Sequence, residues 1–427
     1  MAFVQQVRAT EILDSRGRPT VKATVGLAGG AVGTASVPSG ASTGSAEALE
    51  LRDGEANRYG GLGCRRAVAN VNGEIAGALV GRVFDGQGAV DRAMIELDGT
   101  ANKGRLGANG ILAVSIAFAR ACAAARGVEL WEQFSAILGE TAGGRLPRLT
   151  VNLFSGGKHA GGVGPAIQDV LVVPVRAATI DVGLATVYAV YQSAARLVRR
   201  KYGMGPLTAD EGGLAPPVQT AEELLDDAVE AIRGAGLSPG GDVAICVDVA
   251  ASHFYREGRY FLSRDGEGLD SAGMIAHLAR WAERYPIVSV EDGLAEEDWG
   301  NWPALLSAIG GRAIVVGDDL LCTNPARIRR AVQERAASAL LLKVNQIGTL
   351  TEAAEACRLA RGAGWRVTIS ARSGETEDNW LADLAVGWRG DQIKVGSITQ
   401  SERLAKYNRL LEIEGRKGFG VVEWPGG

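Results

Sequence analysis

Residues 287–292 read Ile287-Val288-Ser289-Val290-Glu291-Asp292, a short run of β-forming residues that ends in two carboxylates. Comparable runs recur from residue 240 onward, at 244–247, 287–290, 313–316, 339–342, 366–369 and 392–393. Helical patterns lie between them, at 271–284, 325–335, 349–361 and 401–414. Apolar strands that alternate with helices indicate a parallel sheet covered on both faces. Six such units in unbroken alternation favour a closed (β/α) barrel over an open sheet.

Each of these runs ends in charged or anion-binding side chains. The groups that follow the runs are, in order, Asp248, Glu291-Asp292, Asp318-Asp319, Lys343, Ser370-Ala371-Arg372-Ser373 and Lys394. One charged residue after a strand is common and needs no functional explanation. Six in series are not explained in this way, and barrel enzymes carry their active sites at the carboxyl ends of the strands.

The order of these groups favours magnesium-assisted chemistry beside a carboxylate. Asp248, Glu291 and Asp318 come from three successive strands and can converge on a hard cation such as Mg²⁺. Zinc is disfavoured, because the chain has only three histidines and no clustered cysteines. Lys343 and Lys394 would lie across from the metal, where one lysine can remove a proton and the metal can stabilise the enolate. We expect neighbouring positive charge to depress the pKa of that lysine.

The first 140 residues show a different pattern of strand-like and helical segments. Strand-like runs at 21–27 and 31–37 flank Gly29-Gly30, which predicts a β-hairpin. A Gly/Ser/Thr-rich loop follows at 38–44, and a helical pattern covers 111–125. We therefore predict a small α+β capping domain over residues 1–140 and a barrel domain over residues 141–427, an α/β protein overall.

Two further segments carry candidate catalytic groups. Glu211 lies in the Gly-flanked sequence Asp210-Glu211-Gly212-Gly213, which suits an acid that protonates a leaving hydroxyl. The alternative for this segment is an ordinary surface turn. His159 lies in the Gly-rich segment 155–162, where a lone histidine is more often structural or solvated than catalytic.

Composition excludes several classes of protein. The 427 residues carry 45 Lys and Arg against 49 Asp and Glu, so the net charge of −4 argues against nucleic acid as a partner. Five scattered cysteines without a CxxC motif favour reduced thiols. The first residues lack the apolar core of a secretion signal, and the most apolar stretch, 111–125, is interrupted by Arg120. We expect a cytoplasmic protein with no membrane partner.

From about residue 10 to residue 415 the chain resembles the enolase family. The motifs that carry the resemblance are EILDSRG at 11–17, PSGASTG at 38–44, LDGTANK at 97–103, DEGG at 210–213, LKVNQIG at 342–348 and RSGETED at 372–378. The resemblance implies a capping domain followed by an enolase-type (β/α)8 barrel whose first strands are irregular. It also implies a homodimer or a higher homo-oligomer.

The resemblance assigns metal and catalytic roles to matching positions. Asp248, Glu291 and Asp318 are similar to the ligands of a first Mg²⁺, and Ser39 is similar to a ligand of a second Mg²⁺ that binds with the substrate. The residues that match the catalytic positions are Lys343 as the base at C2, Glu211 as the acid for the C3 hydroxyl, the loop histidine His159, and Asp169.

Substrate contacts are implied in the same way. Lys394 matches the contact to the substrate carboxylate, and Arg372 and Ser373 match the contacts to its phosphate. Gln168 and Ala371 occupy further positions of the substrate site. The substrate is therefore expected to be a small phosphorylated or phosphonylated carboxylate.

Four positions depart from the family pattern. The family's Gln-Glu is Gln168-Asp169 here, and its Ser-His-Arg-Ser has Ala371 in place of the histidine. His253 replaces a glutamate, and Ser155 replaces an asparagine. The changes at Asp169 and Ala371 fall at the end of the site where hydroxide leaves in the family reaction.

These departures leave three hypotheses for the function. The leading one is a paralogue with an altered substrate, resembling the carboxyphosphonoenolpyruvate synthases of phosphonate biosynthesis, since the losses are confined to the leaving-group end. The alternative is an ordinary enolase that converts 2-phosphoglycerate to phosphoenolpyruvate. A non-catalytic structural or binding homologue is disfavoured, because all three carboxylates and both lysines are present.

Overall fold

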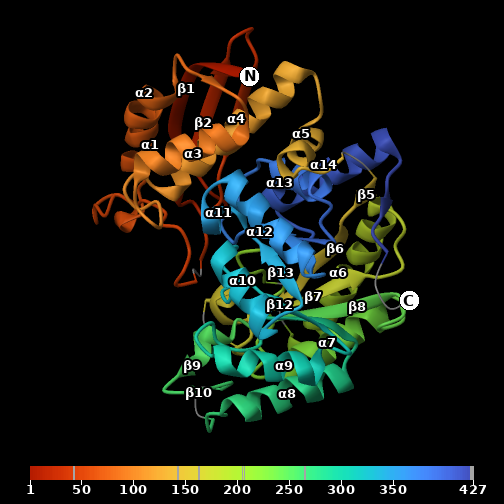
Figure 1. The fold of residues 1–427 in the computed structure, drawn as a ribbon. Helices are drawn as coiled ribbons and strands as arrows, with labels where there is room; N and C mark the ends of the chain where they lie inside the picture. The colour runs from red at the N-terminus through yellow and green to blue at the C-terminus, as the bar shows by residue number, and fades with distance from the viewer. Residues whose placement is uncertain are drawn as a thin grey trace.

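The computed structural model describes residues 1–41, 44–141, 144–161, 164–203, 205, 207–263 and 266–423. Ser42 and Thr43 of the predicted 38–44 loop and Gly162 of the 155–162 segment lie outside the described residues. The N-terminal part of the chain, red to orange in Figure 1, forms a cap on one side of a barrel built from the rest. The expected α/β architecture of cap and barrel is confirmed.

The cap is built on an antiparallel sheet with the strand order β3-β2-β1-β4. Its strands are β1 (Ala2–Leu13), β2 (Pro19–Leu27), β3 (Val32–Ser36) and β4 (Val83–Phe84). The predicted hairpin joins β2 and β3, and both of its turn glycines, Gly29 and Gly30, have positive φ values of 90° and 86°. Strand β1 was not predicted, because polar and charged residues interrupt its apolar pattern.

Helix α4 (Ala108–Arg126) covers one face of this sheet. It is longer than predicted, and its length and composition would allow it to cross a membrane. However, 78% of its apolar window is buried inside the protein, so it serves as the central helix of the cap. Gly33 permits the close contact with β3, since a Cβ atom there would lie 2.1 Å from the Ala117 carbonyl oxygen.

Short helices complete the cap around α4. They are η1 (Tyr59–Gly61), α1 (Arg65–Asn70), the π-helical turn η2 (Val71–Ile75), α2 (Ala76–Leu79), α3 (Gln87–Asp98) and α5 (Leu130–Leu138).

Eight strands close the barrel in the order β11-β12-β13-β14-β15-β6-β7-β8. Their bounds are β6 (Arg148–Ser155), β7 (Asp169–Pro174), β8 (Val243–Asp248), β11 (Ile287–Glu291), β12 (Ile314–Gly317), β13 (Ala339–Leu342), β14 (Arg366–Ser370) and β15 (Gln392–Gly396). All six strands expected from the sequence are present, and β13 has the predicted bounds. Strand β7 runs antiparallel to both of its neighbours, whereas the other pairs are parallel.

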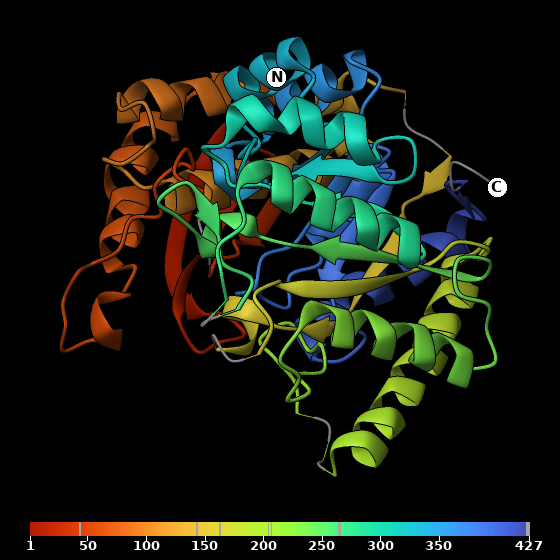
Figure 2. The same ribbon diagram turned by 90° about the horizontal axis from the view of Figure 1, so that it is seen from below.

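Helices surround the strands, as Figure 2 shows from below. They are α6 (Ile180–Tyr202), α7 (Ala221–Gly234), α8 (Ser271–Arg284), α9 (Trp302–Ile309), α10 (Pro325–Glu334), α11 (Val344–Ile347), α12 (Leu350–Gly362), α13 (Trp380–Gly387) and α14 (Ser401–Lys417). Short helical turns are η3 (Gly157–Ala160), η4 (Ala251–Phe254) and η5 (Trp299–Asn301), and small ribbons pair β9 (Tyr255–Arg256) with β10 (Arg259–Tyr260) and β5 (Arg145–Leu146) with β16 (Gly420–Val421).

Polar contacts join the cap to the barrel. Lys103 Nζ donates to Glu352 Oε1 of α12 at 2.9 Å, and Arg120 of α4 donates to Asp378 Oδ2 at 3.0 Å. Ser39 and Gly374 exchange backbone hydrogen bonds of 2.8 and 3.0 Å. The Ser39–Gly374 pair holds the start of the 38–44 loop against the segment that follows β14.

Candidate active site

The predicted carboxylates and lysines lie at the carboxyl ends of the barrel strands. Asp248 and Glu291 are the last residues of β8 and β11, and Asp318 follows β12 directly. Lys343 follows β13, and Lys394 lies within β15, which is opposite β11 in the closed barrel. The strands end in this pattern because each apolar run is buried on both faces, so the first charged side chain falls at the rim.

Lys394 is the counter-ion of two carboxylates. Its Nζ donates to Asp248 Oδ2 at 2.8 Å and to the two oxygens of Glu291 at 2.8 and 2.7 Å. Burial opposes ionisation of Asp248, but the charge of Lys394 outweighs it and lowers the pKa of Asp248 to about 2. Burial and the nearby Asp248 charge raise the pKa of Glu291 well above its ordinary value. The cluster therefore holds more negative charge than Lys394 alone balances.

Lys343 forms an ion pair with Asp318, whose other oxygen accepts a 2.8 Å hydrogen bond from Gln346 Nε2. Burial works against the charged form of Lys343, but the Asp318 carboxylate outweighs it and raises the lysine pKa. The expected depression of this pKa is therefore wrong for the structure described here, because the lysine faces a carboxylate rather than a cation.

The donor set at these strand ends fits a hard divalent cation. Three buried carboxylates and no thiolate offer the oxygen ligands that Mg²⁺ prefers. A cation there would also neutralise the excess charge that raises the pKa of Glu291. In the described part of the chain, however, the carboxylates of Asp248, Glu291 and Asp318 are not drawn together as tightly as two other groups. The ligand atoms lie within 4.8 Å of one another in the group His159, Asp169 and Glu211, and likewise in the group Asp292, Asp318 and Asp319.

Asp292 organises the second of these groups, and its role was not predicted. Its Oδ1 accepts from the Asp318 amide at 2.9 Å and its Oδ2 from the Asp319 amide at 2.7 Å. Its own φ of 44° is unusual for a residue other than glycine and is maintained by these bonds. Asp292 therefore fixes the backbone that presents Asp318.

His159 links the two remaining candidate acids. Its Nδ1 lies 2.8 Å from Asp169 Oδ2, and its Nε2 lies 3.6 Å from Glu211 Oε1. Burial disfavours the imidazolium, but the charges of Asp169 and Glu211 outweigh burial and raise the pKa of His159 to about 9. Burial raises the pKa of Glu211, but the His159 charge opposes it and the net shift is downward. At neutral pH the His159 side chain is therefore a charged imidazolium that lies between the carboxylates of Asp169 and Glu211.

Asp169 is buried behind the site and does not line the cavity. Its Oδ1 accepts hydrogen bonds from Asn152 Nδ2 at 2.8 Å and from Ser155 Oγ at 2.7 Å, and the residue is fully buried. The replacement of the family's asparagine by Ser155 thus supplies a short hydroxyl donor to the shortened carboxylate. Asp169 is positioned to act on His159 rather than on a substrate.

A narrow cavity of about 20 Å³ lies between these groups. Its lining residues are Ala41, His159, Gln168, Glu211, Asp248, Lys343, Ser370, Ala371, Arg372, Ser373 and Lys394. The structure thus brings together nine of the sequence-predicted residues around one cavity. Ala371 forms part of the wall, yet no large hollow results from the missing imidazole.

The phosphate side of the predicted site contains Arg372, Ser373 and Ser39. Arg372 forms a bidentate ion pair with Glu47 at 3.0 and 3.2 Å. Ser373 Oγ accepts from Arg16 at 3.2 Å. Ser39 Oγ donates to Glu50 at 2.8 Å and is not on the cavity wall. Glu47 and Glu50 were missed by the sequence analysis, although they follow the 38–44 loop closely.

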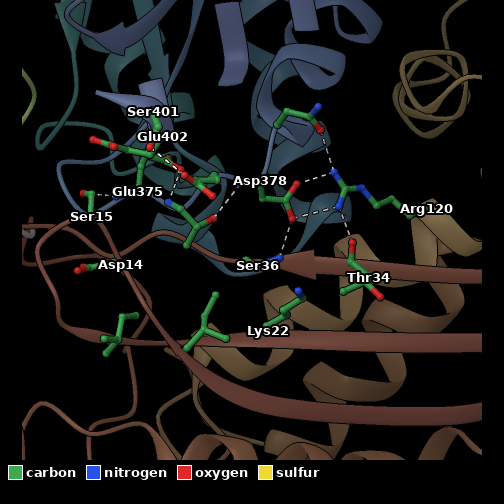
Figure 3. Close-up of a pocket in the computed structure, with 15 residues that line it drawn as sticks. Asp14, Ser15, Lys22, Thr34, Ser36, Arg120, Glu375, Asp378, Ser401 and Glu402 are labelled. Atoms are coloured by element: carbon green, nitrogen blue, oxygen red, sulfur yellow. Dashed lines mark hydrogen bonds and ion pairs between the residues drawn. The ribbon is translucent and has the colours of Figure 1, made fainter. Parts of the chain in front are cut away.

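A larger cleft of about 790 Å³ lies elsewhere, between the cap sheet and the segment 375–379 (Figure 3). Lys22 and Arg120 come from the cap side, and Glu375, Asp378 and Glu402 come from the barrel side. None of the predicted site residues lines this cleft, so its size does not make it the candidate active site.

Comparison with known proteins agrees with this geometry. The family model described as the enolase N-terminal domain matches residues 4–134, and the one described as the enolase C-terminal TIM barrel domain matches residues 144–422. The chain belongs to the enolase family. It is 48% identical over 418 residues to Enolase 1 of Methylococcus capsulatus (strain Bath), an alignment that covers 98% of each chain.

Membership in the enolase family settles the class of the protein. It is an enzyme, a Mg²⁺-dependent carbon–oxygen lyase. The likeness to an enolase along almost the whole chain favours the ordinary enolase over the altered-substrate paralogue. No finding supports phosphonate biosynthesis, so the leading sequence hypothesis gives way to its alternative.

Proposed function

We propose that the protein dehydrates 2-phosphoglycerate to phosphoenolpyruvate, as an ordinary enolase does. The observation that carries the proposal is the cluster at the strand ends, where Lys343, Lys394 and Glu211 face one cavity beside buried carboxylates. The 48% identity to Enolase 1 supports the same reaction.

Asp248, Glu291 and Asp318 are the proposed ligands of one Mg²⁺, and Ser39 is the proposed ligand of a second that accompanies the substrate. When bound, the metal supplies positive charge that stabilises an enolate and binds the substrate carboxylate. A cation at Asp318 would compete with Lys343 for the same carboxylate, which would lower the lysine pKa toward the value that a base requires.

Lys343 is the proposed base. It follows β13 and its side chain lines the cavity, so it can receive the proton from the carbon beside the substrate carboxylate. Lys394, which lies two strands away on β15, can bind that carboxylate when Asp248 and Glu291 are neutralised by a cation. Lys343 therefore removes the proton, and Lys394 neutralises the charge of the substrate carboxylate.

Glu211 and His159 are proposed to handle the leaving hydroxyl together. Glu211 must carry a proton to act as the acid, yet the His159 charge lowers its pKa. The proton on His159, whose Nε2 lies 3.6 Å from Glu211 Oε1, is the proposed source. Asp169 holds the imidazole from its other side and keeps it charged until the proton moves.

The remaining proposed contacts to the substrate come from other residues that line the cavity. Arg372 and Ser373 are proposed to bind the phosphate group. Gln168 donates from Nε2 to Asp248 at 3.1 Å, while its buried Oε1 has no hydrogen-bond partner among the described residues. That oxygen can accept a hydrogen bond from a substrate hydroxyl. Ala371 is proposed to leave room for water beside the departing hydroxide.

We also propose that the enzyme works in the cytoplasm as a homodimer or a higher homo-oligomer, with its domains divided at residues 140 and 141. The family resemblance supports these points. Sedimentation analysis at micromolar concentration tests the assembly, and a monomer would refute it.

The activity is tested by the absorbance of enolpyruvate on addition of 2-phosphoglycerate and Mg²⁺. We expect a kcat on the order of 10 s⁻¹ or more, in the ordinary range for enzymes. The double variant Ala371→His with Asp169→Glu separates the two enolase hypotheses. An ordinary enolase should gain less than about tenfold in kcat/KM, whereas a gain of about 10² or more, the contribution of a general acid–base group, would restore the altered-substrate hypothesis.

A further inference from the structure

We propose that Glu47 is a positioning residue that orients Arg372 for the substrate phosphate and joins it to the metal ligand Asp318. The inference rests on the proposed function, because that function assigns the phosphate to Arg372. Glu47 is not one of the residues that the motifs singled out, and its role follows from its contacts.

Glu47 and Arg372 form a buried, two-pronged ion pair. Arg372 Nη1 lies 3.0 Å from Glu47 Oε2, and Arg372 Nη2 lies 3.2 Å from Glu47 Oε1. The two side chains are 6% and 3% exposed, so water does not compete for this contact. Two parallel hydrogen bonds fix the plane of a guanidinium more tightly than a single bond does. Arg372 lines the active-site cavity, so fixing its plane fixes the direction of its charge.

The electrostatics of the pair agree with an orienting role. Burial disfavours the charged form of Arg372, but the Glu47 carboxylate outweighs it and raises the arginine pKa. A fully buried cation without this partner would carry a large desolvation penalty. Glu47 therefore keeps a charged arginine inside the protein before any phosphate arrives.

Gln346 connects this ion pair to the proposed metal site. Its Nε2 lies 3.3 Å from Glu47 Oε1 and 2.8 Å from Asp318 Oδ1. Its Oε1 accepts a 2.7 Å hydrogen bond from Thr323, which fixes the direction of the amide. The side-chain amide of Gln346 thus lies between the Glu47 carboxylate, which orients Arg372, and the Asp318 carboxylate, which is a proposed metal ligand.

Asn345 makes a parallel connection one residue earlier. Its Oδ1 accepts from Arg372 Nη1 at 3.0 Å, and its Nδ2 lies 3.4 Å from Glu50 Oε1. Glu50 in turn accepts from Ser39 Oγ at 2.8 Å. Two adjacent amides after Lys343 therefore connect Arg372 to both proposed metal-binding regions.

The test compares the holoenzyme with Glu47→Gln, Glu47→Asp and a matched control, Glu352→Gln. The control removes another ion pair between cap and barrel, Lys103 with Glu352 at 2.9 Å, and neither of these residues lines the cavity. Two quantities are measured for each protein, the kcat for 2-phosphoglycerate and the dissociation constant of inorganic phosphate by calorimetry with Mg²⁺ present.

In Glu47→Gln we expect kcat to fall while the affinity for phosphate rises, so that the dissociation constant also falls. The kcat should fall about tenfold or more, because a misplaced arginine misplaces the substrate. Phosphate should bind about threefold more tightly or better, because Arg372 loses a competing negative charge at close range. Glu47→Asp keeps the charge but shortens the reach, so its phosphate affinity should stay near wild type while its kcat falls. Glu352→Gln should change neither quantity by more than about twofold, because neither Glu352 nor its partner Lys103 lines the cavity.

Wild-type values for both quantities in Glu47→Gln would overturn the inference. A lower kcat with unchanged phosphate affinity in Glu47→Gln would also overturn it, since that result marks a purely structural role. The phosphate measurement needs no turnover. A wild-type protein that binds phosphate but does not convert 2-phosphoglycerate would therefore refute the proposed function, while the shift in phosphate affinity would still decide the role of Glu47.

Discussion

Replacing Lys394 by methionine tests the electrostatics of the strand-end cluster. In the structure its ammonium donates three hydrogen bonds of 2.7–2.8 Å to Asp248 and Glu291, and all three side chains are buried. Methionine has a similar volume but no charge, so the variant leaves two buried carboxylates without their cation. The perturbation is therefore almost purely electrostatic.

The size of the effect follows from the burial of the pair. Removing one partner of a buried ion pair costs about 3–5 kcal/mol. For a chain of this length we expect the melting temperature of the metal-free variant to fall by roughly 5–10 °C. Because burial and Asp248 already raise the pKa of Glu291, that carboxyl binds a proton more readily when folded than when unfolded. Folded-state protonation stabilises the variant as the pH falls, so the deficit should shrink toward acid pH.

Calorimetric melting with and without Mg²⁺ supplies the readout. In the wild-type protein Mg²⁺ must displace Lys394 from the carboxylates, whereas in the variant they are already open. We therefore expect Mg²⁺ to raise the melting temperature more in Lys394→Met than in wild type, and turnover of 2-phosphoglycerate to be lost. A metal-free variant as stable as wild type, with an equal response to Mg²⁺, would refute the assignment of these carboxylates.

Three further outcomes follow from the same geometry. Asp318→Ala should lose calorimetric Mg²⁺ binding and the stabilisation that bound metal gives, while its circular dichroism stays native. Asp292→Ala should weaken Mg²⁺ binding by about 10- to 100-fold without touching the ion itself, since it supports the backbone of a ligand; unchanged affinity would remove that role. The His159 pKa of about 9 predicts a stabilisation present below pH 6.5 and lost as the pH rises through 9, seen as the difference in melting temperature between wild type and His159→Gln.

The barrel was predictable because its signals are local. Runs such as 339–342 are short, apolar and flanked by helical patterns, so their bounds could be read directly from the sequence. Strand β1 was not predicted, because its polar residues face away from the cap core and break the pattern. The antiparallel direction of β7 was also not predicted from the sequence. A helix-length connection marks a parallel crossover, whereas the described residues between β6 and β7 form only a short helical turn.

The candidate site was predictable where chemistry follows a strand. Asp248, Glu291 and Lys343 are found by that rule alone. The roles of Glu47 and Asp292 were not predicted, because these residues act through neighbours. Glu47 acts through a guanidinium from another strand end, and Asp292 acts through two backbone amides. Such roles depend on three-dimensional contacts between segments far apart in the chain, which residue spacing does not reveal.

The most direct test of the account follows the C2 hydrogen of 2-phosphoglycerate by NMR in deuterated water with Mg²⁺. The wild-type protein should exchange this hydrogen and form phosphoenolpyruvate, and Lys343→Ala should do neither while it remains folded. Absence of both exchange and product with the wild-type protein, or exchange that persists in Lys343→Ala, would contradict the account.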